Sequence, residues 1–426
     1  MTAKPSLAFA GMTHLGLCSG IAAAAKGFDV VLFDPDRTRI SEITAGRFPV
    51  VEPDLERLFA ANRERISCSS DAADLRRADL VYVAPDVPTD DAGQSDLAGL
   101  RTLLALVTPA VGEKAVLVIL SQVPPGFTRS LGPQRMPLYY QVETLIFGRA
   151  MQRALEPERF IVGASEPGRP LAGPLAAYLA SFGCPILTMR YESAELAKIS
   201  INMCLVASVG VANTMAELCE QVGADWSEIV PALKLDRRIG AYSYLAPGLG
   251  LAGGNLERDL ATVTSLAKAH STDCGIVEAW VANSTHRKSW AWKMVSKHVL
   301  PQKPRPRIAV LGLAYKENTR STKNSPSLAL LAKLADCQVS VFDPVVAADV
   351  APIAVSAGDS AMAAIAGADA VAIMTPWPEF RALQPDEMVK AMAGRILIDP
   401  YRVIDSAHAR AAGLTYLTLG VAPQTA

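Results

Sequence analysis

The sequence predicts an α/β protein with two Rossmann-like, doubly wound lobes joined by a long central helix and a helical middle domain. Three observations lead to this prediction. Residues 5–34 show the pattern strand, glycine turn, helix and strand, residues 192–222 form an apolar stretch without proline, and strand-like runs resume at Arg307. A chain of 426 residues is also too long for one typical domain.

The composition indicates a well-packed soluble protein, because half of the residues are hydrophobic and 19% are charged. The net charge of −1 gives no reason to expect nucleic acid or an anionic membrane as a partner. The seven cysteines lie mostly in apolar runs and predict reduced thiols, hence a cytoplasmic protein. The chain opens with a strand-like run instead of a signal peptide, and no apolar run reaches the ~18 residues of a membrane-spanning helix. The five histidines show no metal-ligand spacing, so no metal is predicted.

The first structural unit of the chain is a predicted dinucleotide-binding βαβ unit. Residues 5–12 read as a strand, residues 16–26 as an alanine-rich helix and residues 29–34 as a second strand that ends in Asp34. An acid at the end of the second strand, ~20 residues past the first glycine, is where such folds bind the ribose hydroxyls. Asp34 is therefore expected to favour NAD over NADP.

The glycine fingerprint of this unit is degraded. Gly11 and Gly16 occupy its first and third glycine positions, but Thr13 stands at the second, where the backbone approaches the pyrophosphate. A β-branched side chain there should crowd the cofactor, and His14 is expected to be a loop residue. The pattern predicts dinucleotide binding, with a βαβ unit that has lost its cofactor as the alternative.

The apolar stretch at residues 192–222 predicts one long helix. Its apolar residues keep helical spacing, and Gly210 is its one weak point. About 30 residues would extend ~45 Å, which is long enough to bridge two lobes and to pair with a second subunit. Lys198 and Asn202 lie four residues apart and therefore share one face of this helix. A solvated lysine and a surface asparagine are the alternative interpretation.

Residues 247–254 form a glycine-rich loop that leads into a helix. Four glycines within eight residues exclude a strand or a helix interior, and a periodic apolar run follows directly. Such a loop exposes backbone N–H groups and lets a ligand approach the main chain closely. The loop is thus predicted to hold an anion or a reacting sugar, unless it is an ordinary glycine-rich connection.

This stretch resembles a motif of the NAD-dependent nucleotide-sugar dehydrogenases, the UDP-glucose and GDP-mannose 6-dehydrogenases. Their loop reads Pro-Gly-x-Gly-(Phe/Leu)-Gly-Gly-x-Cys-x-x-(Lys/Arg)-Asp. The matching residues are Pro247, Gly248, Gly250, Gly253, Arg258 and Asp259. Asn255 takes the place of the nucleophilic cysteine, and an asparagine cannot form the thiohemiacetal that a thiolate forms.

The resemblance implies a catalytic set for this chain. Lys198 and Asn202 match the family's Glu-x-x-Lys-x-x-x-Asn helix, and with Asp259 they would assist the first of two hydride transfers. Glu143 matches the glutamate of an Asn-Pro-Glu motif. Asn255 stands at the position of the second oxidation's nucleophile, and Phe147 replaces a second glutamate. The apparatus of the first oxidation is therefore retained, while much of the second is lost.

The resemblance also implies cofactor and substrate residues. Gln122 replaces a threonine beside the nicotinamide, and Lys323 stands where the family has an arginine near the cofactor. Tyr401 takes the place of a substrate arginine, with Arg402 one position late. The expected cofactor-binding residues are Gly11, Thr13, Gly16, Asp34, Gln122 and Lys323, and the expected substrate-binding residues are Arg238, Tyr244, Gly250, Gly253, Lys316 and Arg402.

Four segments are expected along the chain. They are an NAD-binding domain at residues 1–187, a central helical domain for dimerisation and substrate at 188–300, a linker at 301–306 and a nucleotide-sugar-binding α/β domain at 307–426. The expected partners are a nucleotide-sugar substrate and a second copy of the chain, paired through the central helix. No nucleic acid and no membrane partner is expected.

Three functions are compatible with these residues. The first is NAD-dependent oxidation of a CH–OH group on a nucleotide sugar, UDP-hexose-like, limited to one step or using an altered second step; a variant returns the hydride and epimerises the sugar. The second is the same class of enzyme with another substrate, its pocket reshaped by Phe147, Gln122 and Tyr401. The third is a non-catalytic protein that binds NAD or a nucleotide sugar. The lysine and acid that are retained favour an enzyme, and Thr13 favours the third function.

Overall fold

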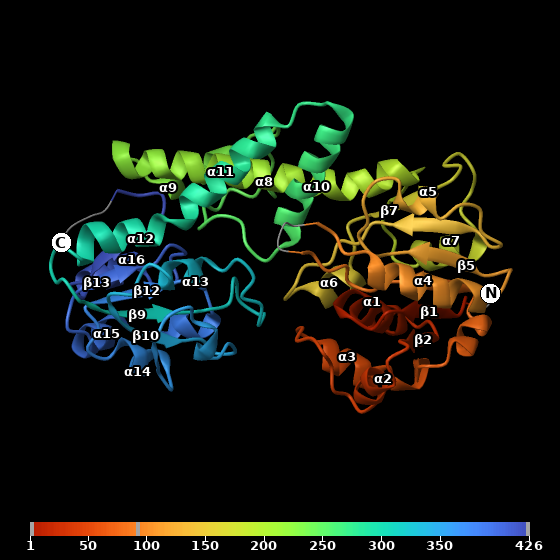
Figure 1. Ribbon diagram of the computed structural model, residues 1–426, viewed down its shortest axis with the longest axis horizontal. Helices are drawn as coiled ribbons and strands as arrows, with labels where there is room; N and C mark the ends of the chain where they lie inside the picture. The colour runs from red at the N-terminus through yellow and green to blue at the C-terminus, as the bar shows by residue number, and fades with distance from the viewer. Residues whose placement is uncertain (1–3, 91–93, 423–426) are drawn as a thin grey trace. The chain divides into compact units, whose positions relative to one another are not determined.

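The computed structural model describes residues 4–90 and 94–422, and it separates into two compact units at the boundary between Ile201 and Asn202 (Figure 1). Both units are built on parallel sheets covered by helices, so the predicted α/β class with Rossmann-like lobes is confirmed. We call them the N-terminal unit and the C-terminal unit.

The N-terminal unit contains an eight-stranded sheet with the order β3-β2-β1-β4-β5-β6-β7-β8. Every pairing in this sheet is parallel except that of β6 with β7. The strands are β1 (Leu7–Ala10), β2 (Val30–Phe33), β3 (Ile66–Ser69), β4 (Leu80–Val83), β5 (Val116–Ile119), β6 (Leu138–Gln141), β7 (Phe160–Ala164) and β8 (Ile186–Arg190). The helices are α1 (His14–Ala25), α2 (Arg37–Thr44), α3 (Leu55–Ala61), α4 (Ala98–Ala110), α5 (Phe127–Ser130), α6 (Ala150–Leu155) and α7 (Gly173–Ala180), with short η1 (Arg63–Arg65) and η2 (Ala72–Arg77).

The central strands of this sheet are buried on both faces. All four residues of β1, β4 and β5 are buried, which explains their continuous apolar sequences. Alternate residues of β1 enter different clusters, Phe9 with α1 on one face and Ala8 with α4 on the other. The sheet therefore separates two apolar layers, and its C-terminal edge carries the loops that follow β1, β2 and β4.

The predicted long helix is α8 (Tyr191–Val222), and its bounds differ from the predicted ones by one residue. It starts in the N-terminal unit and continues into the C-terminal unit. Within the part of the chain that the structure describes, α8 is the one helix long and apolar enough to cross a membrane by length and composition. The sequence prediction counted only uninterrupted apolar runs, and α8 contains polar residues between its apolar ones. One third of its most apolar window is buried within the structure, which is weak evidence for a membrane span.

The C-terminal unit joins a helical layer to a six-stranded parallel sheet with the order β11-β10-β9-β12-β13-β14. This order is that of the dinucleotide-binding folds. The helices are α9 (Trp226–Leu235), α10 (Asn255–His270), α11 (Gly275–Lys288), α12 (Trp290–Met294), α13 (Pro326–Leu331), α14 (Ala361–Ile365), α15 (Pro385–Ala391) and α16 (Ser406–Ala411), with η3 (Val295–Val299), η4 (Ala348–Val350) and η5 (Pro378–Ala382). The strands are β9 (Arg307–Leu311), β10 (Gln338–Phe342), β11 (Ser356–Ala357), β12 (Ala370–Ile373), β13 (Ile396–Ile398) and β14 (Thr415–Leu417).

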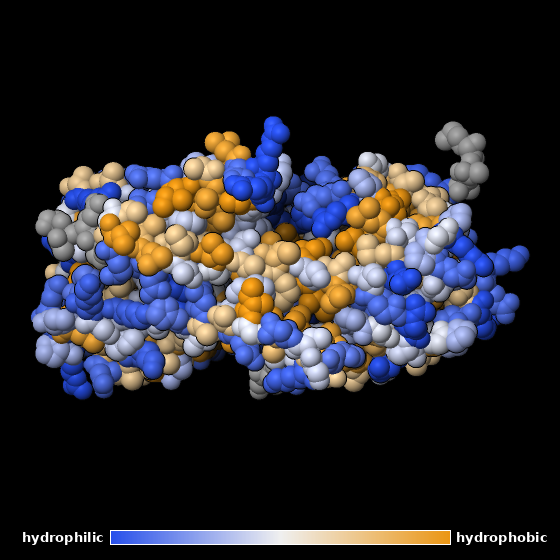
Figure 2. All heavy atoms as spheres, turned by 90° about the horizontal axis from the view of Figure 1, so that it is seen from above, coloured by the Kyte–Doolittle hydropathy of each residue, from blue (hydrophilic) through white to orange (hydrophobic). Residues whose placement is uncertain are grey.

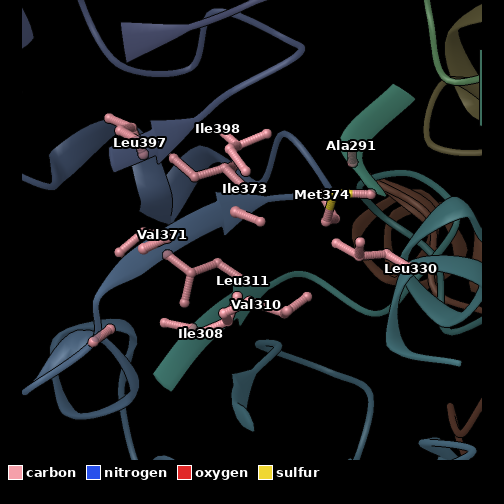
Figure 3. Close-up of a cluster of buried hydrophobic side chains, with 14 of the residues drawn as sticks. Ala291, Ile308, Val310, Leu311, Leu330, Val371, Ile373, Met374, Leu397 and Ile398 are labelled. Carbon is pink, nitrogen blue, oxygen red and sulfur yellow. The ribbon is translucent and has the colours of Figure 1, made fainter. Parts of the chain in front are cut away.

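The core of this unit lies along its central strands. Figure 3 shows Ile308 and Val310 of β9 beside Ile373 of β12 and Ile398 of β13. Ala291 of α12 belongs to the same cluster, so the helical layer and the sheet share one apolar core. This shared core fixes the glycine-rich loop of the helical layer against the loops of the sheet.

Candidate functional site

The turn after β1 has the geometry of a dinucleotide fold. Gly11 has a φ of 97°, and its N–H donates to the carbonyl of Phe33 at the end of β2 (2.8 Å). A β-carbon on Gly11 would lie 2.7 Å from the nitrogen of Pro85, and one on Gly16 would lie 2.1 Å from the carbonyl oxygen of Gly11. Only glycine fits at either position, which keeps α1 packed tightly on the strands.

Asp34 holds this turn from the end of β2. Its carboxylate accepts hydrogen bonds from the backbone N–H of Met12 (2.8 Å) and of Asp36 (3.0 Å), and from the Arg39 guanidinium (2.9 Å). Asp34 is buried, whereas Arg39 is partly exposed. Asp34, the residue predicted to bind the ribose hydroxyls, therefore also fixes the conformation of the glycine turn.

The start of α1 is bound to a carboxylate from another loop. Asp86, which follows β4, accepts a hydrogen bond from the His14 N–H (2.9 Å), and the Asp86 N–H donates to the Thr13 hydroxyl (2.7 Å). The expectation that His14 is a loop residue is wrong, because His14 is buried and is the first residue of α1. Asp86 is not among the residues that the sequence predicts for the site.

The His14 side chain enters a buried polar cluster. Its Nε2 lies 2.7 Å from the carboxylate of Glu52, which also accepts from the N–H groups of Gly148 and Ala150. Burial opposes ionisation of Glu52, but these hydrogen bonds hold its pKa below the usual range. The Phe147 ring stacks on the imidazole with centroids 4.1 Å apart. Phe147, which the sequence places where the family has a second glutamate, therefore covers one face of the His14 imidazole.

Lys198 and Glu143 form an ion pair in the N-terminal unit. The Lys198 Nζ lies 2.7 Å from Glu143 Oε1, and the two side chains are only 12% and 16% exposed. Glu143 also accepts from the Leu145 N–H (3.0 Å). A cavity of about 40 Å³ next to Glu143 is lined in part by Tyr82 and Gln141, whose side chains are hydrogen-bonded to each other (2.8 Å). The charges of Lys198 and Glu143 are therefore largely shielded from solvent.

Glu195 of α8 holds the loop that carries Gln122. Its carboxylate accepts from the N–H groups of Gly126 (2.6 Å) and Thr128 (2.8 Å) at the start of α5. Burial raises the pKa of Glu195, which these hydrogen bonds oppose. Gln122 itself is buried. The motif glutamate of the helix therefore acts as a cap for the loop at residues 121–126, a role that helical periodicity alone does not reveal.

The glycine-rich loop lies in the C-terminal unit and is anchored along its length. Gly248 N–H donates to Asn213 of α8 (2.8 Å), Leu251 N–H to the Ser284 hydroxyl (2.8 Å), and Gly253 N–H to the carbonyl of Lys323 (3.0 Å). Gly250, Gly253 and Gly254 have φ values of 82°, 89° and 92°. A β-carbon on Gly250 would lie 2.4 Å from the Ser284 carbonyl oxygen, and one on Gly253 would lie 2.5 Å from the Tyr315 ring. Close packing therefore requires these glycines.

The loop ends where α10 begins, and two predicted residues lie there. Asn255 is the first residue of α10 and is exposed. Asp259 follows one turn later and is 1% exposed. It accepts from the Asn202 side-chain amide and lies 3.3 Å from Arg258 Nε. The structure thus joins Asn202 to Asp259 within the C-terminal unit, four residues along α10 from the helix N-terminus.

Lys323 and Lys316 surround the same loop. The Lys323 side chain covers Gly254, where a β-carbon would lie 3.1 Å from its Cδ. The Lys316 ammonium lies 5.7 Å from the centroid of the Tyr315 ring, which itself packs on Gly253. Both lysines therefore place positive charge beside the glycine-rich loop, an arrangement suited to an anion.

The remaining predicted substrate residues lie elsewhere in the C-terminal unit. Arg238 has a side chain that is 89% exposed, and it pairs with Asp236 (2.6 Å). Tyr244 is also exposed. The Arg402 guanidinium contacts Asp225 (2.9 Å) and the Ser227 hydroxyl (2.8 Å) at the start of α9. The guanidinium of Arg402 is thus engaged by another part of the chain.

No metal cluster is seen in the described part of the chain, where no three His, Cys, Asp or Glu side chains come together as ligands. The seven cysteines are free thiols, and none of them belongs to the glycine-rich loop. The polar pairs described above are the lysine–glutamate pair of the N-terminal unit and the asparagine–aspartate pair of the C-terminal unit.

The strand order of both sheets and the glycine turn after β1 are those of a dinucleotide-binding fold. Comparison with family models makes the class specific, and the chain belongs to the UDP-glucose/GDP-mannose dehydrogenase family. Residues 6–170 match its NAD binding domain, residues 192–285 its central domain and residues 309–406 its UDP binding domain.

Relatives of known function match over nearly the whole chain. A UDP-glucose 6-dehydrogenase of Rickettsia bellii is 26% identical over 97% of this chain and 99% of its own. The UDP-glucose 6-dehydrogenase TuaD of Bacillus subtilis is 27% identical over 97% and 93%. The solved structure of a UDP-glucose dehydrogenase from Pyrobaculum islandicum has a TM-score of 0.85 with 24% identity, covering 99% of each chain, and supports the fold.

NAD is the cofactor of this family's N-terminal domain, and the residues of this chain fit it at the ribose end. Gly11 and Gly16 provide the tight turn, and Asp34 stands at the end of β2 where ribose hydroxyls bind. When bound, NAD supplies the hydride acceptor of the reaction. The pyrophosphate end differs, because the Asp86 carboxylate is bound to the first N–H of α1.

Proposed function

We propose that this chain is an NAD-dependent oxidoreductase that acts on the CH–OH group of a nucleotide sugar, UDP-hexose-like, by a single or altered oxidation step. The observation that carries this proposal is the N-terminus of α10. There an exposed Asn255 stands where the family has a nucleophilic cysteine, one turn before the buried Asp259–Asn202 pair. Lys316 and Lys323 beside the glycine loop suit the diphosphate of a nucleotide sugar.

The retained residues can serve the first oxidation. Removal of hydride from the carbinol carbon and of the hydroxyl proton turns the alcohol into an aldehyde. A cationic Lys198 stabilises negative charge that develops on the sugar oxygen, and Glu143 keeps the ammonium in place at 2.7 Å. Asp259, kept oriented by Asn202, is a candidate to order the water or proton acceptor.

The second oxidation lacks its covalent step. An aldehyde must first add a nucleophile before a second hydride can leave, and the amide nitrogen of Asn255 is not nucleophilic at neutral pH. Position 147 supplies no carboxylate, because it is a phenylalanine, and its ring stacks on His14. The product of a single turnover at a primary alcohol is therefore expected to be an aldehyde. At a secondary alcohol it is a ketone, and return of the hydride to the opposite face of that carbonyl gives an epimer.

The test is the yield of NADH per sugar. Purified protein, NAD and UDP- or GDP-hexoses would be followed by NADH absorbance, with products identified by mass. One NADH per sugar with an aldehyde product supports the proposal, and two NADH with an acid would overturn it. Without NADH, a changed sugar indicates epimerisation, and an unchanged sugar that still binds indicates a binding protein.

An engineered nucleophile sharpens this test. Asn255→Cys restores a thiol at the first position of α10, where the helix N-terminus favours a thiolate. The variant should raise the yield from one NADH per sugar toward two, with an acid as the new product. Asn255→Ser is the matched control, because it has a similar size without thiolate chemistry, and it should leave the yield at one.

We further propose that the protein is a cytoplasmic homodimer paired through α8. Val211, Met215, Leu218 and Val222 are exposed at spacings of four, three and four residues, so they form one apolar stripe along the helix. Figure 2 shows that apolar side chains are exposed among hydrophilic ones on the face that it views. Met215→Glu should convert dimer to monomer in light scattering, whereas Ser200→Glu, at an exposed position earlier on α8, should not.

A further inference from the structure

Asp86 closes the N-terminus of α1 from a neighbouring loop. The carboxylate accepts from the His14 N–H (2.9 Å), and the main chain of Asp86 is fixed by the Thr13 hydroxyl (2.7 Å). Thr13 and His14 are the second and third residues after Gly11 in the degraded fingerprint. Thr13 itself makes no side-chain cap to α1. The cap of this helix is thus provided by Asp86, which follows β4.

The N-terminus of the first helix is where a dinucleotide fold binds the pyrophosphate. The free N–H groups of the first turn and the helix dipole favour an anion at this point. In this chain the N–H of the first helical residue already holds an anion that belongs to the protein. A pyrophosphate and the Asp86 carboxylate therefore compete for one donor and repel each other.

The surrounding charges distinguish Asp86 from its acidic neighbours. Asp34 faces Arg39, Glu52 faces His14 and Glu143 faces Lys198, each across less than 3 Å. Asp86 is bound by the His14 N–H and has no cation at such a distance in the described contacts. Burial and, to a smaller extent, the charge of Glu143 raise the pKa of Asp86, which His14 and the Thr13 hydroxyl oppose. The residue is exposed, so its side chain has room to turn toward solvent. The geometry is that of an exposed residue whose carboxylate is bound to the first N–H of α1.

We propose that Asp86 competes with the pyrophosphate of NAD for the N-terminus of α1 and thereby sets the affinity of this chain for its cofactor. NAD binds when the carboxylate releases the His14 N–H and turns outward. The release weakens binding by the energy of one charge-assisted hydrogen bond and by the repulsion that remains. This proposal concerns cofactor binding, and it does not depend on which sugar is oxidised or on how many steps.

The test compares ligands with and without a pyrophosphate. Binding of NADH, ADP-ribose and adenosine to the full chain would be measured by calorimetry for the wild type, Asp86→Asn and Asp86→Ala. Removing one negative charge next to the phosphates should tighten NADH and ADP-ribose by at least about tenfold. Adenosine should bind within about twofold of its wild-type affinity, because it has no phosphate to compete.

A matched control keeps the result specific. Asp71→Asn changes another carboxylate that accepts a backbone N–H at the start of a short helix, at residues 72–77, and should alter no affinity. Thermal unfolding and circular dichroism would show that each variant is folded. Asp86→Ala and Asp86→Asn differ in size. If one of them fails to fold, the NADH affinity of the other still tests the proposal.

Three results would overturn the proposal. They are an unchanged or weaker NADH affinity in the folded variants, equal tightening of adenosine, and no NADH binding by any form. A variant can gain affinity for NADH and still oxidise no sugar, so failure of the proposed reaction is seen separately from failure of this proposal.

Discussion

The edge of the first sheet at Gly11 and the edge of the second sheet at Gly312 are built alike. Each glycine follows the central strand with a positive φ, 97° and 92°, and each N–H donates over 2.8 Å to the phenylalanine that ends the neighbouring strand. Asp34 and Asp343 follow those phenylalanines, and each accepts a backbone N–H just beyond the glycine, from Met12 (2.8 Å) and Leu313 (2.6 Å).

The two edges differ in the segment that comes after the glycine. After Gly11 the helix α1 begins within three residues, and its first N–H groups lie at the edge of the sheet. After Gly312 the chain makes a long loop before α13 at Pro326, and the hydroxyls of Ser325 and Ser327 bind the carbonyls of Leu313 and Gly312. The second edge is therefore closed by its own side chains.

This difference shows how one topology serves two ligands. The first edge has a helix N-terminus, which suits a pyrophosphate, and the Asp86 carboxylate accepts the first N–H of that helix. The second edge offers the loop that carries Tyr315, Lys316 and Lys323 against the glycine-rich loop. Strand order alone thus does not predict which groups lie at the edge of each sheet, because the segments after the two glycines differ in length.

The largest expected effect comes from the two edge glycines. In Gly312→Ala the new β-carbon would lie 2.4 Å from Thr375, and in Gly11→Ala 2.7 Å from Pro85, both at a strained φ. Overpacking and the left-handed backbone together should cost about 4 kcal/mol in each case. Thermal and denaturant unfolding would measure the loss.

Matched controls separate the two causes. Gly46→Ala and Gly413→Ala have φ values of 78° and 91° but no atom within 4 Å of the new β-carbon. They should lose only about 1 kcal/mol. Equal losses in all four variants would show that backbone strain, and not the close approach of the neighbouring strand, explains the glycine.

A buried carboxylate of the N-terminal unit, Glu52, is the next position to test. Glu52→Gln removes the charge that holds His14, Gly148 and Ala150, which should cost about 3 kcal/mol at neutral pH. The pKa of Glu52 is lowered by folding, so its contribution is complete above the ordinary glutamate pKa of ~4.3 and is lost as pH falls through the lower folded pKa.

Unfolding midpoints of wild type and Glu52→Gln would be compared from pH 7 down to pH 3. Their difference should narrow below about pH 4, where the wild-type carboxylate also becomes protonated. Glu42→Gln, which changes the exposed pair with Arg47, should behave like the wild type throughout. A difference between wild type and Glu52→Gln that is independent of pH would contradict an ionised Glu52.

Asp343 tests the closed edge directly. Its carboxylate accepts from the N–H groups of Leu313 and Ala314 and from the Trp377 indole. Asp343→Asn leaves part of these donors unpaired and should cost about 2 kcal/mol, with weaker UDP binding as the loop loosens. Asp34→Asn should weaken NADH binding and leave UDP binding unchanged, and calorimetry with both ligands would show whether the effects separate.

The sequence was sufficient for those features that repeat locally. The βαβ pattern, the helix at residues 192–222 and the glycine loop follow from apolar period and glycine spacing, and the structure places them within a few residues. Thr13 is visible in the sequence as a departure from the fingerprint, but its consequence is not. Glu52 and Asp86 reach His14 from 38 and 72 residues away, in loops without period, so only the folded chain shows them.

Arg402 gives the smallest expected effect, and it decides how far the second sheet departs from the family. The residue follows β13 with a φ of 53°, a conformation that no sequence period indicates, and this turn directs its guanidinium to Asp225 and Ser227. A partly exposed pair of this kind contributes at most about 1 kcal/mol. Arg402→Ala should therefore lower stability slightly and leave UDP affinity within about twofold.

Tyr401→Arg, which moves a cation to the family's position, is the informative partner variant. Tighter UDP binding in Tyr401→Arg with no loss in Arg402→Ala would assign Arg402 to the contact with α9, and a large loss in Arg402→Ala would return it to the substrate site.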